Sequence, residues 1–187
     1  MEFLHSLILG LVQGLTEFLP VSSSGHLVVF QTLFGFGQEG SHMAFDILLH
    51  LGTLVAVFVA FRRDIWELIK AFFALAGAVF TGKFKWKQAP GAQRLVVLLV
   101  LACVPLVLVV PFKDKLEALY VFPAVVGGLL ILNGFMLLMA DKLASGRKDE
   151  GNAQVKDSFI VGLFQAMAVV PGISRSGATI TGGLISG

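Results

Sequence analysis

The sequence has few charged residues and a single cysteine. Only 14% of its 187 residues are Asp, Glu, Lys or Arg, whereas a soluble domain has about a quarter, and 56% are hydrophobic. The small net charge of +2, with basic residues confined to a few loops, argues against nucleic-acid binding. Cys103 has no cysteine partner, which excludes an intramolecular disulfide or a cysteine-built metal site. These shortages, with a mean hydropathy of +0.86, predict an all-α integral membrane protein.

Three apolar runs predict membrane-crossing helices, at residues 44–61, 95–110 and 121–140. Residues 65–80 carry charges in their first half and leave only about ten clean apolar residues, so we expect an interfacial helix there. The N-terminus lacks the basic region and cleavage site of a signal peptide, and residue 1 is expected to be the mature start.

Basic residues gather in two segments, 62–94 and 141–157. The segment between the last two crossings offers only Lys113 and Lys115, balanced by Asp114 and Glu117. The positive-inside rule therefore predicts that the two basic segments are cytoplasmic and that the Lys113 loop faces outward.

An internal repeat relates the two ends of the chain. A shift of 152 positions, which moves Ser6 onto Ser158, aligns Gln13 with Gln165 and the Ser-x-Ser-Gly of residues 22–25 with that of residues 174–177. Three crossings separate the copies, so they would lie inverted in the membrane, as in proteins whose broken helices build a site at the midplane. We predict one membrane domain over residues 1–187, with a first repeat at about 1–110 and a second, incomplete at its C-terminus, from about 121.

Each copy is also predicted to form a re-entrant helix-loop-helix hairpin within a polytopic helical bundle. A short apolar half-helix runs into a Pro/Ser/Gly turn, and irregular backbone at membrane depth needs protein or a water-filled cavity around it. The alternative for the first copy is one spanning helix that Pro20 kinks and that continues through Phe30.

Two polar motifs interrupt these apolar stretches: QGLTEFLPVSSSGH at residues 13–26 and PGISRSG at residues 171–177. They hold Glu17, His26 and Arg175, each of which costs roughly 2.5–3.5 kcal/mol near the membrane centre unless it pairs or binds a ligand. We therefore treat the two motifs as one site.

The first motif suggests a metal and an anion site. Gln13 and Glu17 share a helix face and could present an amide and a carboxylate to Mg²⁺. Hydroxyl and backbone N–H donors follow at the start of the next helix, a typical anion site, from Ser22, Ser23 and Ser24. Beside them, His26 could be a general base, a general acid or a nucleophile.

The second motif repeats the turn with Ser174 and Ser176 and adds Arg175, whose guanidinium can fork onto phosphate oxygens. Simple helix capping would explain either serine turn, but it does not explain an arginine at membrane depth. Asp46 and His50 are either lining residues of the same cavity or an interfacial pair.

The residues that carry a family resemblance are the first motif, FDILLHLGTLVAV and PGISRSGATITGG. Through them the chain resembles the undecaprenyl-diphosphate phosphatase family of bacterial inner membranes, the bacitracin-resistance type, over essentially its whole length. The resemblance implies hydrolysis of a C55 polyprenyl diphosphate to the monophosphate and inorganic phosphate, which recycles the lipid carrier of cell-wall synthesis. It also implies Mg²⁺ or Ca²⁺ as cofactor and an active site open to the periplasm. By that resemblance the site consists of Gln13, Glu17, Ser23, His26, Ser174, Arg175, Ser176 and Thr179.

The roles expected from the resemblance are metal or base chemistry for Glu17, nucleophile or its activation for Ser23 or His26, and diphosphate binding for Arg175 and the second-motif hydroxyls. The chain departs from the family at Gln13, where many members have Glu, and at His50, more often Gln. It also ends at Gly187, where members continue, so we expect a fragment. The oligomeric state stays open, a homodimer included.

A polyprenyl-phosphate flippase or anion transporter is the main rival, because inverted repeats with broken helices are common in transporters. A purely structural membrane protein ranks third, since it leaves the buried ionisable residues unexplained.

Overall fold

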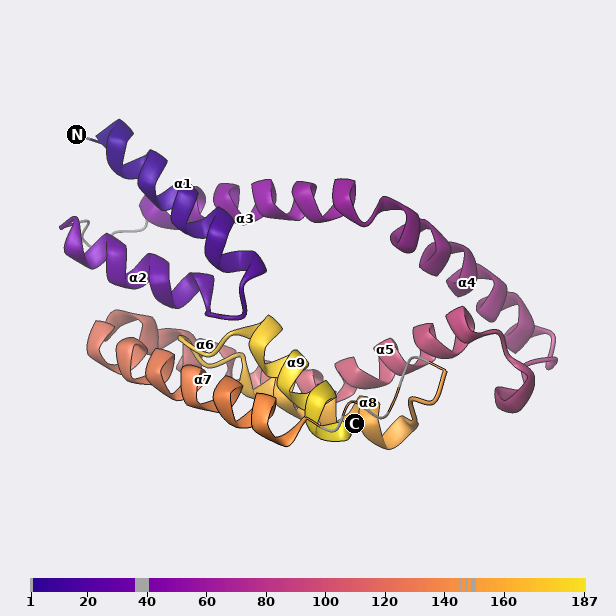
Figure 1. Cartoon of the computed structure of the whole chain (residues 1–187). Coiled ribbons are helices and arrows are strands. Elements are labelled where there is room, and N and C mark those ends of the chain that lie inside the picture. The colour runs from indigo at the N-terminus through magenta and orange to yellow at the C-terminus, as the bar shows by residue number, and fades with distance from the viewer. Residues whose placement is uncertain (1, 36–40, 145, 147, 149–150) are drawn as a thin grey trace.

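The computed structural model describes residues 2–35, 41–144, 146, 148 and 151–187, and within these residues it contains helices and no strand. Figure 1 shows α1, α2 and α3 on one side of the molecule and α5 to α9 on the other, with α4 joining the two. The prediction of an all-α protein is confirmed. The α-helices are α1 Glu2–Phe18, α2 Ser23–Leu33, α3 Ser41–Ala60, α4 Arg62–Phe80, α5 Gly91–Val109, α6 Lys113–Glu117, α7 Pro123–Leu143, α8 Val155–Met167 and α9 Arg175–Ser186. Short 3-10 helices are η1 Trp86–Gln88, η2 Val110–Phe112 and η3 Ala118–Val121.

Two helical segments of the described chain are long and apolar enough to cross a membrane, Gly91–Val121 and Pro123–Leu143. They contain the second and third predicted crossings. The predicted crossing at residues 44–61 is helical too, but it qualifies only as a bent pair with α4, at an angle of 81°. The charged residues that end the apolar run begin α4, so the chain turns where lipid burial would become unfavourable.

The surface outside the helix contacts is strongly apolar. Side chains such as Phe3 and Phe80 are 83% and 91% exposed, and many large hydrophobic residues on every long helix are more than half exposed. The buried core instead contains small residues and several polar ones. A surface of this kind is stable in lipid, where exposed apolar side chains carry no penalty, and it supports a membrane protein.

Both motifs form turns between paired helices. The first turn joins α1 to α2, which pack against each other, and the second joins α8 to α9, which do the same. Pro20 lies in the first turn, outside both helices, so the alternative of a single kinked helix through Phe30 is wrong. The chain reverses there because Ser22 adopts φ +70°, a left-handed conformation that no helix continues through.

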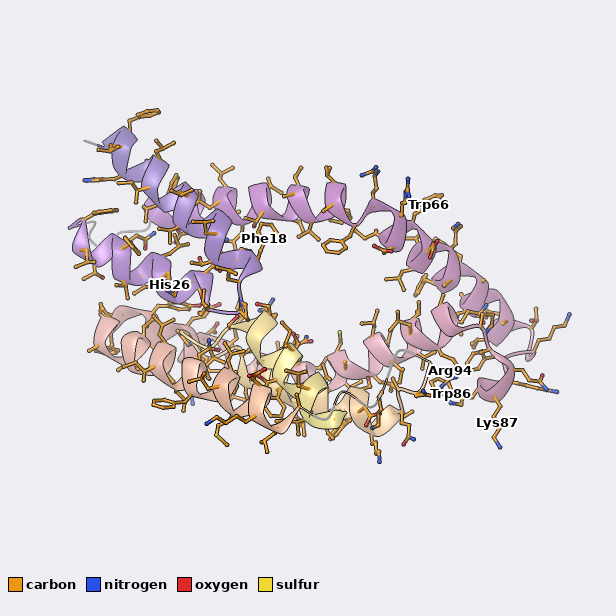
Figure 2. The ribbon with its side chains drawn as sticks, in the orientation of Figure 1. Phe18, His26, Trp66, Trp86, Lys87 and Arg94 are labelled. Atoms are coloured by element: carbon orange, nitrogen blue, oxygen red, sulfur yellow. The ribbon has the colours of Figure 1, made fainter. Side chains whose placement is uncertain are left out.

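The last part of the basic segment 62–94 lies at the opposite end of the molecule from the first motif. Figure 2 shows Trp86, Lys87 and Arg94 at the far end from His26. The Arg94 guanidinium stacks 5.1 Å from the centre of the Trp86 ring. This contact fixes the start of α5 against the loop after α4, with the aromatic ring and cation of a membrane-interface anchor.

An ion pair between a buried carboxylate and an exposed lysine anchors the start of α8. Lys148 donates to Asp157 at 2.7 Å, and the backbone N–H of Gln154 donates to the other Asp157 oxygen at 2.9 Å. Burial raises the pKa of Asp157, but the Lys148 and Gln154 hydrogen bonds and the nearby charges of Lys148 and Lys156 lower it by more, to below its ordinary 3.8. Ionised Asp157 therefore stabilises the fold fully above its ordinary pKa of 3.8. This contribution to the free energy of unfolding is lost as the pH falls through the lowered pKa of the folded state.

Replacing Asp157 with Asn is accordingly expected to lower the free energy of unfolding by about 1–3 kcal/mol at neutral pH and by less at a pH below the ordinary pKa of 3.8, near pH 3. Thermal unfolding in detergent at both pH values measures this. Asp141→Asn, at an exposed position near the end of α7, is the control and should change little. An equal loss of stability at both pH values would contradict the linkage to ionisation.

Candidate active site

A cavity of about 700 Å³ lies where seven α-helices, two 3-10 helices and both motif turns converge. Its apolar wall comes mainly from α5 and the second turn. The polar lining consists of Thr16, Glu17, Ser22, Ser23, Ser24, His50, Lys113, Glu117, Tyr120, Gln165, Ser174, Arg175, Ser176 and Thr179. Such a mixture suits a ligand with an ionic head and an apolar body.

The two turns that carry the motifs touch each other in a reciprocal way. A Cβ added to Gly25 would come within 3.2 Å of the Gly172 Cα, and one added to Gly177 would come within 2.9 Å of the Pro20 carbonyl oxygen. The 152-residue shift of the predicted repeat aligns Gly25 with Gly177 and Pro20 with Gly172. Glycine is needed at both contacts because any side chain would push the turns apart.

Two helix N-termini open into the same cavity. Ser22 caps α2 and accepts a hydrogen bond from the Gly25 N–H, and Ser174 caps α9 and accepts one from the Gly177 N–H. The first residues of both helices line the cavity. Helix N-termini present free backbone N–H groups and partial positive charge, so this arrangement favours an anion.

Glu17 is the polar centre of the first motif. Its Oε2 accepts a hydrogen bond from Gln13 Nε2 at 2.9 Å and a second from the Ser23 hydroxyl. His50 Nε2 lies 3.9 Å from the same oxygen. Within the described part of the chain these contacts all involve Oε2, so Oε1 remains available. A hydroxyl that donates to a carboxylate is the arrangement of a nucleophile with its base.

Arg175 begins α9 and faces the cavity. Among the described residues its guanidinium forms no hydrogen bond or ion pair. The neighbouring Ser174 and Ser176 hydroxyls lie 3.0 Å apart and hydrogen-bond to each other. An unpaired guanidinium beside a helix N-terminus is a strong phosphate-binding element, because the fork of N–H donors matches phosphate oxygens.

Comparison with known proteins places these features in a family. The family described as "Bacitracin resistance protein BacA" matches residues 6–187, nearly the whole chain. The chain belongs to this family. An undecaprenyl-diphosphatase of Methanobrevibacter smithii is 41% identical over 190 residues, covering 100% of this chain and 68% of the relative. One of Carboxydothermus hydrogenoformans is 42% identical, covering 100% and 64%. The chain thus spans about two thirds of the length of these relatives.

The cavity brings together eight of the ten predicted site residues: Glu17, Ser22, Ser23, Ser24, Ser174, Arg175, Ser176 and Thr179. Seven of the eight belong to the two motifs and could be found from local sequence, whereas Thr179 was predicted through the family resemblance. Their catalytic and binding roles stay predictions.

Gln13 and His26 are not among the lining residues. Gln13 is 1% exposed, and its amide donates to Glu17, so it holds the carboxylate and reaches the cavity only through it. His26 Nδ1 lies 2.8 Å from the Ser22 carbonyl oxygen. A carbonyl can only accept, so Nδ1 carries the proton and Nε2 is the nitrogen left for other contacts.

Of the pair at residues 46 and 50, only His50 lines the cavity; Asp46 accepts a hydrogen bond from Gln31 at 2.8 Å. Among the polar lining residues that were not predicted as site residues, Lys113, Glu117 and Tyr120 form one group. They come from α6 and η3, and Lys113 forms an ion pair with Glu117 at 3.3 Å. Sequence gave one hint, since this is the loop predicted to face outward.

Proposed function

We propose that the protein hydrolyses undecaprenyl diphosphate to undecaprenyl phosphate and inorganic phosphate. The observation that carries the proposal is the placement of the Ser23–Glu17 pair and of Arg175 across one cavity between two helix N-termini. The relatives at about 40% identity are named for this activity, and membership in the family supports the same substrate. The apolar wall of the cavity suits the start of the lipid chain.

The diphosphate would bind between the N-termini of α2 and α9, with the Arg175 guanidinium on its oxygens. The Ser23 hydroxyl attacks the distal phosphorus and gives its proton to Glu17, while the bond from phosphorus to the bridging oxygen breaks and releases the lipid monophosphate. Water then cleaves the phosphoserine and yields phosphate. Direct attack by a water that Glu17 deprotonates uses the same contacts. His50 lines the cavity, and its Nε2 lies 3.9 Å from Glu17 Oε2, so it is the imidazole placed for proton transfer there.

The oxygen donors at the cavity are compatible with Mg²⁺ or Ca²⁺ bound together with the substrate. No group of three or more His, Cys, Asp and Glu residues suited to a metal occurs in the described chain. Mg²⁺, however, is commonly held by one or two carboxylates together with substrate phosphates and water. Glu17, through its available Oε1, would be the protein ligand, with Gln13 as the group that orients it. When bound, the ion would neutralise charge on the phosphates.

Removal of divalent metal with EDTA is therefore expected to lower the rate of phosphate release at least tenfold, and added Mg²⁺ or Ca²⁺ should restore it. The measurement is phosphate release by the purified protein in detergent, with EDTA titrated against each metal. A rate that is unchanged in excess EDTA would contradict the proposed metal.

The membrane arrangement proposed from the repeat is an inverted one. We place the first repeat at about residues 1–110 and the second from about 121, with each motif turn in a re-entrant hairpin. The reciprocal contacts of Gly25 and Gly177 support this pairing. The cavity would open to the periplasm of a bacterial inner membrane, because Lys113 of the outward loop lines it. A homodimer is compatible with this arrangement.

The rival function is transport or flipping of a polyprenyl phosphate through the same cavity. An assay in detergent distinguishes hydrolysis from transport. A micelle has no two compartments between which a lipid could be moved, but a hydrolase still consumes its substrate there. We expect undecaprenyl diphosphate to disappear with one phosphate released per lipid. If well-folded protein leaves the lipid intact but moves it across vesicles, the transporter is correct.

A further inference from the structure

Asn133 is a buried amide in the middle of an otherwise apolar helix. It lies on α7 and is 3% exposed. An unsatisfied amide in such surroundings is unfavourable by several kcal/mol, so its partners indicate why the helix carries it. Those partners are the turns of the two motifs.

One side chain bonds to both turns. Asn133 Nδ2 donates to the Pro20 carbonyl at 3.1 Å, and the Ser174 backbone N–H donates to Asn133 Oδ1 at 2.9 Å. Pro20 is 113 residues away in the sequence and Ser174 is 41 residues away. Among side chains that fit this space, a primary amide provides a donor and an acceptor together, which neither leucine nor an ionised aspartate can do.

These two hydrogen bonds connect the two motif turns, whose separation sets the distance between the two halves of the site. Pro20 lies two residues before the N-cap of α2, and Ser174 is the N-cap of α9. The helix starts that follow carry Ser23 and Arg175, which must face the same phosphate. Asn133 does not line the cavity, so it lies behind the turns and touches no substrate.

We propose that Asn133 is a positioning residue that fixes the spacing between the two phosphate-binding turns. The inference rests on the proposed function, since it assigns the spacing to diphosphate binding and hydrolysis. A displacement of about 1 Å between reacting groups can reduce a rate about 100-fold. Loss of both hydrogen bonds would allow such a displacement, because they are the polar link that α7 makes to the two turns.

The test compares Asn133→Leu, which removes both bonds but keeps the branching and heavy-atom number of the side chain, with Asn133→Asp, which keeps an acceptor for the Ser174 N–H. Ala140→Gly is the matched control: Ala140 is fully buried two turns along the same helix, and the substitution lowers stability through lost helix propensity and one buried methyl group. For each variant, kcat and KM are measured for phosphate release in detergent, with thermal unfolding in parallel. A second readout is the rise in unfolding temperature caused by methylenediphosphonate, a diphosphate that cannot be hydrolysed.

We expect kcat to fall about 10- to 100-fold in Asn133→Leu, with KM within a few-fold of the wild type, and to fall less in Asn133→Asp. The control should keep its kcat although its unfolding temperature drops. A folded Asn133→Leu or Asn133→Asp protein with unchanged kcat and unchanged stabilisation by the analogue would show that Asn133 only supports packing, and would overturn the inference. Absence of hydrolysis by the wild type would instead refute the proposed function. In that case the inference would still hold if the analogue stabilises the wild type and Ala140→Gly but not Asn133→Leu. It would be wrong if the analogue stabilises all three proteins equally or none of them.

Discussion

Glu17→Gln is expected to reduce the rate of phosphate release from undecaprenyl diphosphate by about 10²–10⁴-fold. The substitution keeps the shape of the side chain and the acceptor for the Ser23 hydroxyl, but it removes the negative charge that accepts a proton. It also replaces the carboxylate that would contact a metal. The kcat for phosphate release in detergent, with Mg²⁺ in excess, measures the effect.

The control for this prediction is Glu67→Gln, the same chemical change on an exposed part of α4. It should leave kcat within about twofold, as surface substitutions away from a site generally do. Ser23→Ala separates the two routes to hydrolysis: it abolishes turnover if the serine is the nucleophile, and it leaves measurable turnover if Glu17 activates water. A Glu17→Gln protein with wild-type kcat would contradict the role of the carboxylate.

Arg175→Ala is expected to reduce kcat/KM by about 10³-fold or more, a loss of about 4 kcal/mol of transition-state binding. Negative charge spreads over the phosphoryl oxygens during transfer, and this guanidinium is the cavity cation without a carboxylate partner among the described residues. Arg175→Lys should recover only part of the rate, because an ammonium cannot bind two phosphate oxygens in one plane.

Arg63→Ala, on the exposed start of α4, is the control and should keep its kcat/KM. The measurement is phosphate release over a range of lipid concentrations, so that kcat and KM are obtained separately. An increase in KM alone, with kcat unchanged, would mean that Arg175 binds substrate and transition state equally. Full activity of Arg175→Ala would move the anion site elsewhere, and Lys113 would be the first alternative.

Much of the site could be read from the sequence because its residues are close together in two short motifs. Proline, serine and glycine clusters specify a turn and the start of a helix locally, so the positions of Ser23 and Ser174 followed from the pattern itself. The crossings at residues 95–110 and 121–140 followed from length and composition. The charged residues at 62–64 mark where the apolar run at residues 44–61 ends, but the 81° angle between its helix and α4 is set by tertiary structure.

The roles of individual polar residues were harder to predict. Gln13 and Glu17 share a helix face as expected, but they bond to each other, so only the carboxylate lines the cavity. His26 lies two residues after the last of the serines, but its ring is hydrogen-bonded to the Ser22 carbonyl oxygen. The rotation of a helix about its own axis decides which of its side chains reach a cavity. That rotation depends on how the helix packs against other helices.

The sequence by itself determined the helical class, the membrane environment and the two polar turns, because hydrophobic run length, charge content and turn chemistry act over a few residues. Tertiary structure decided how the turns meet and what surrounds them. Lys113 enters the cavity and Asn133 joins the two turns through contacts between residues far apart in the chain. Such contacts depend on the packing of whole helices, and no local pattern records them.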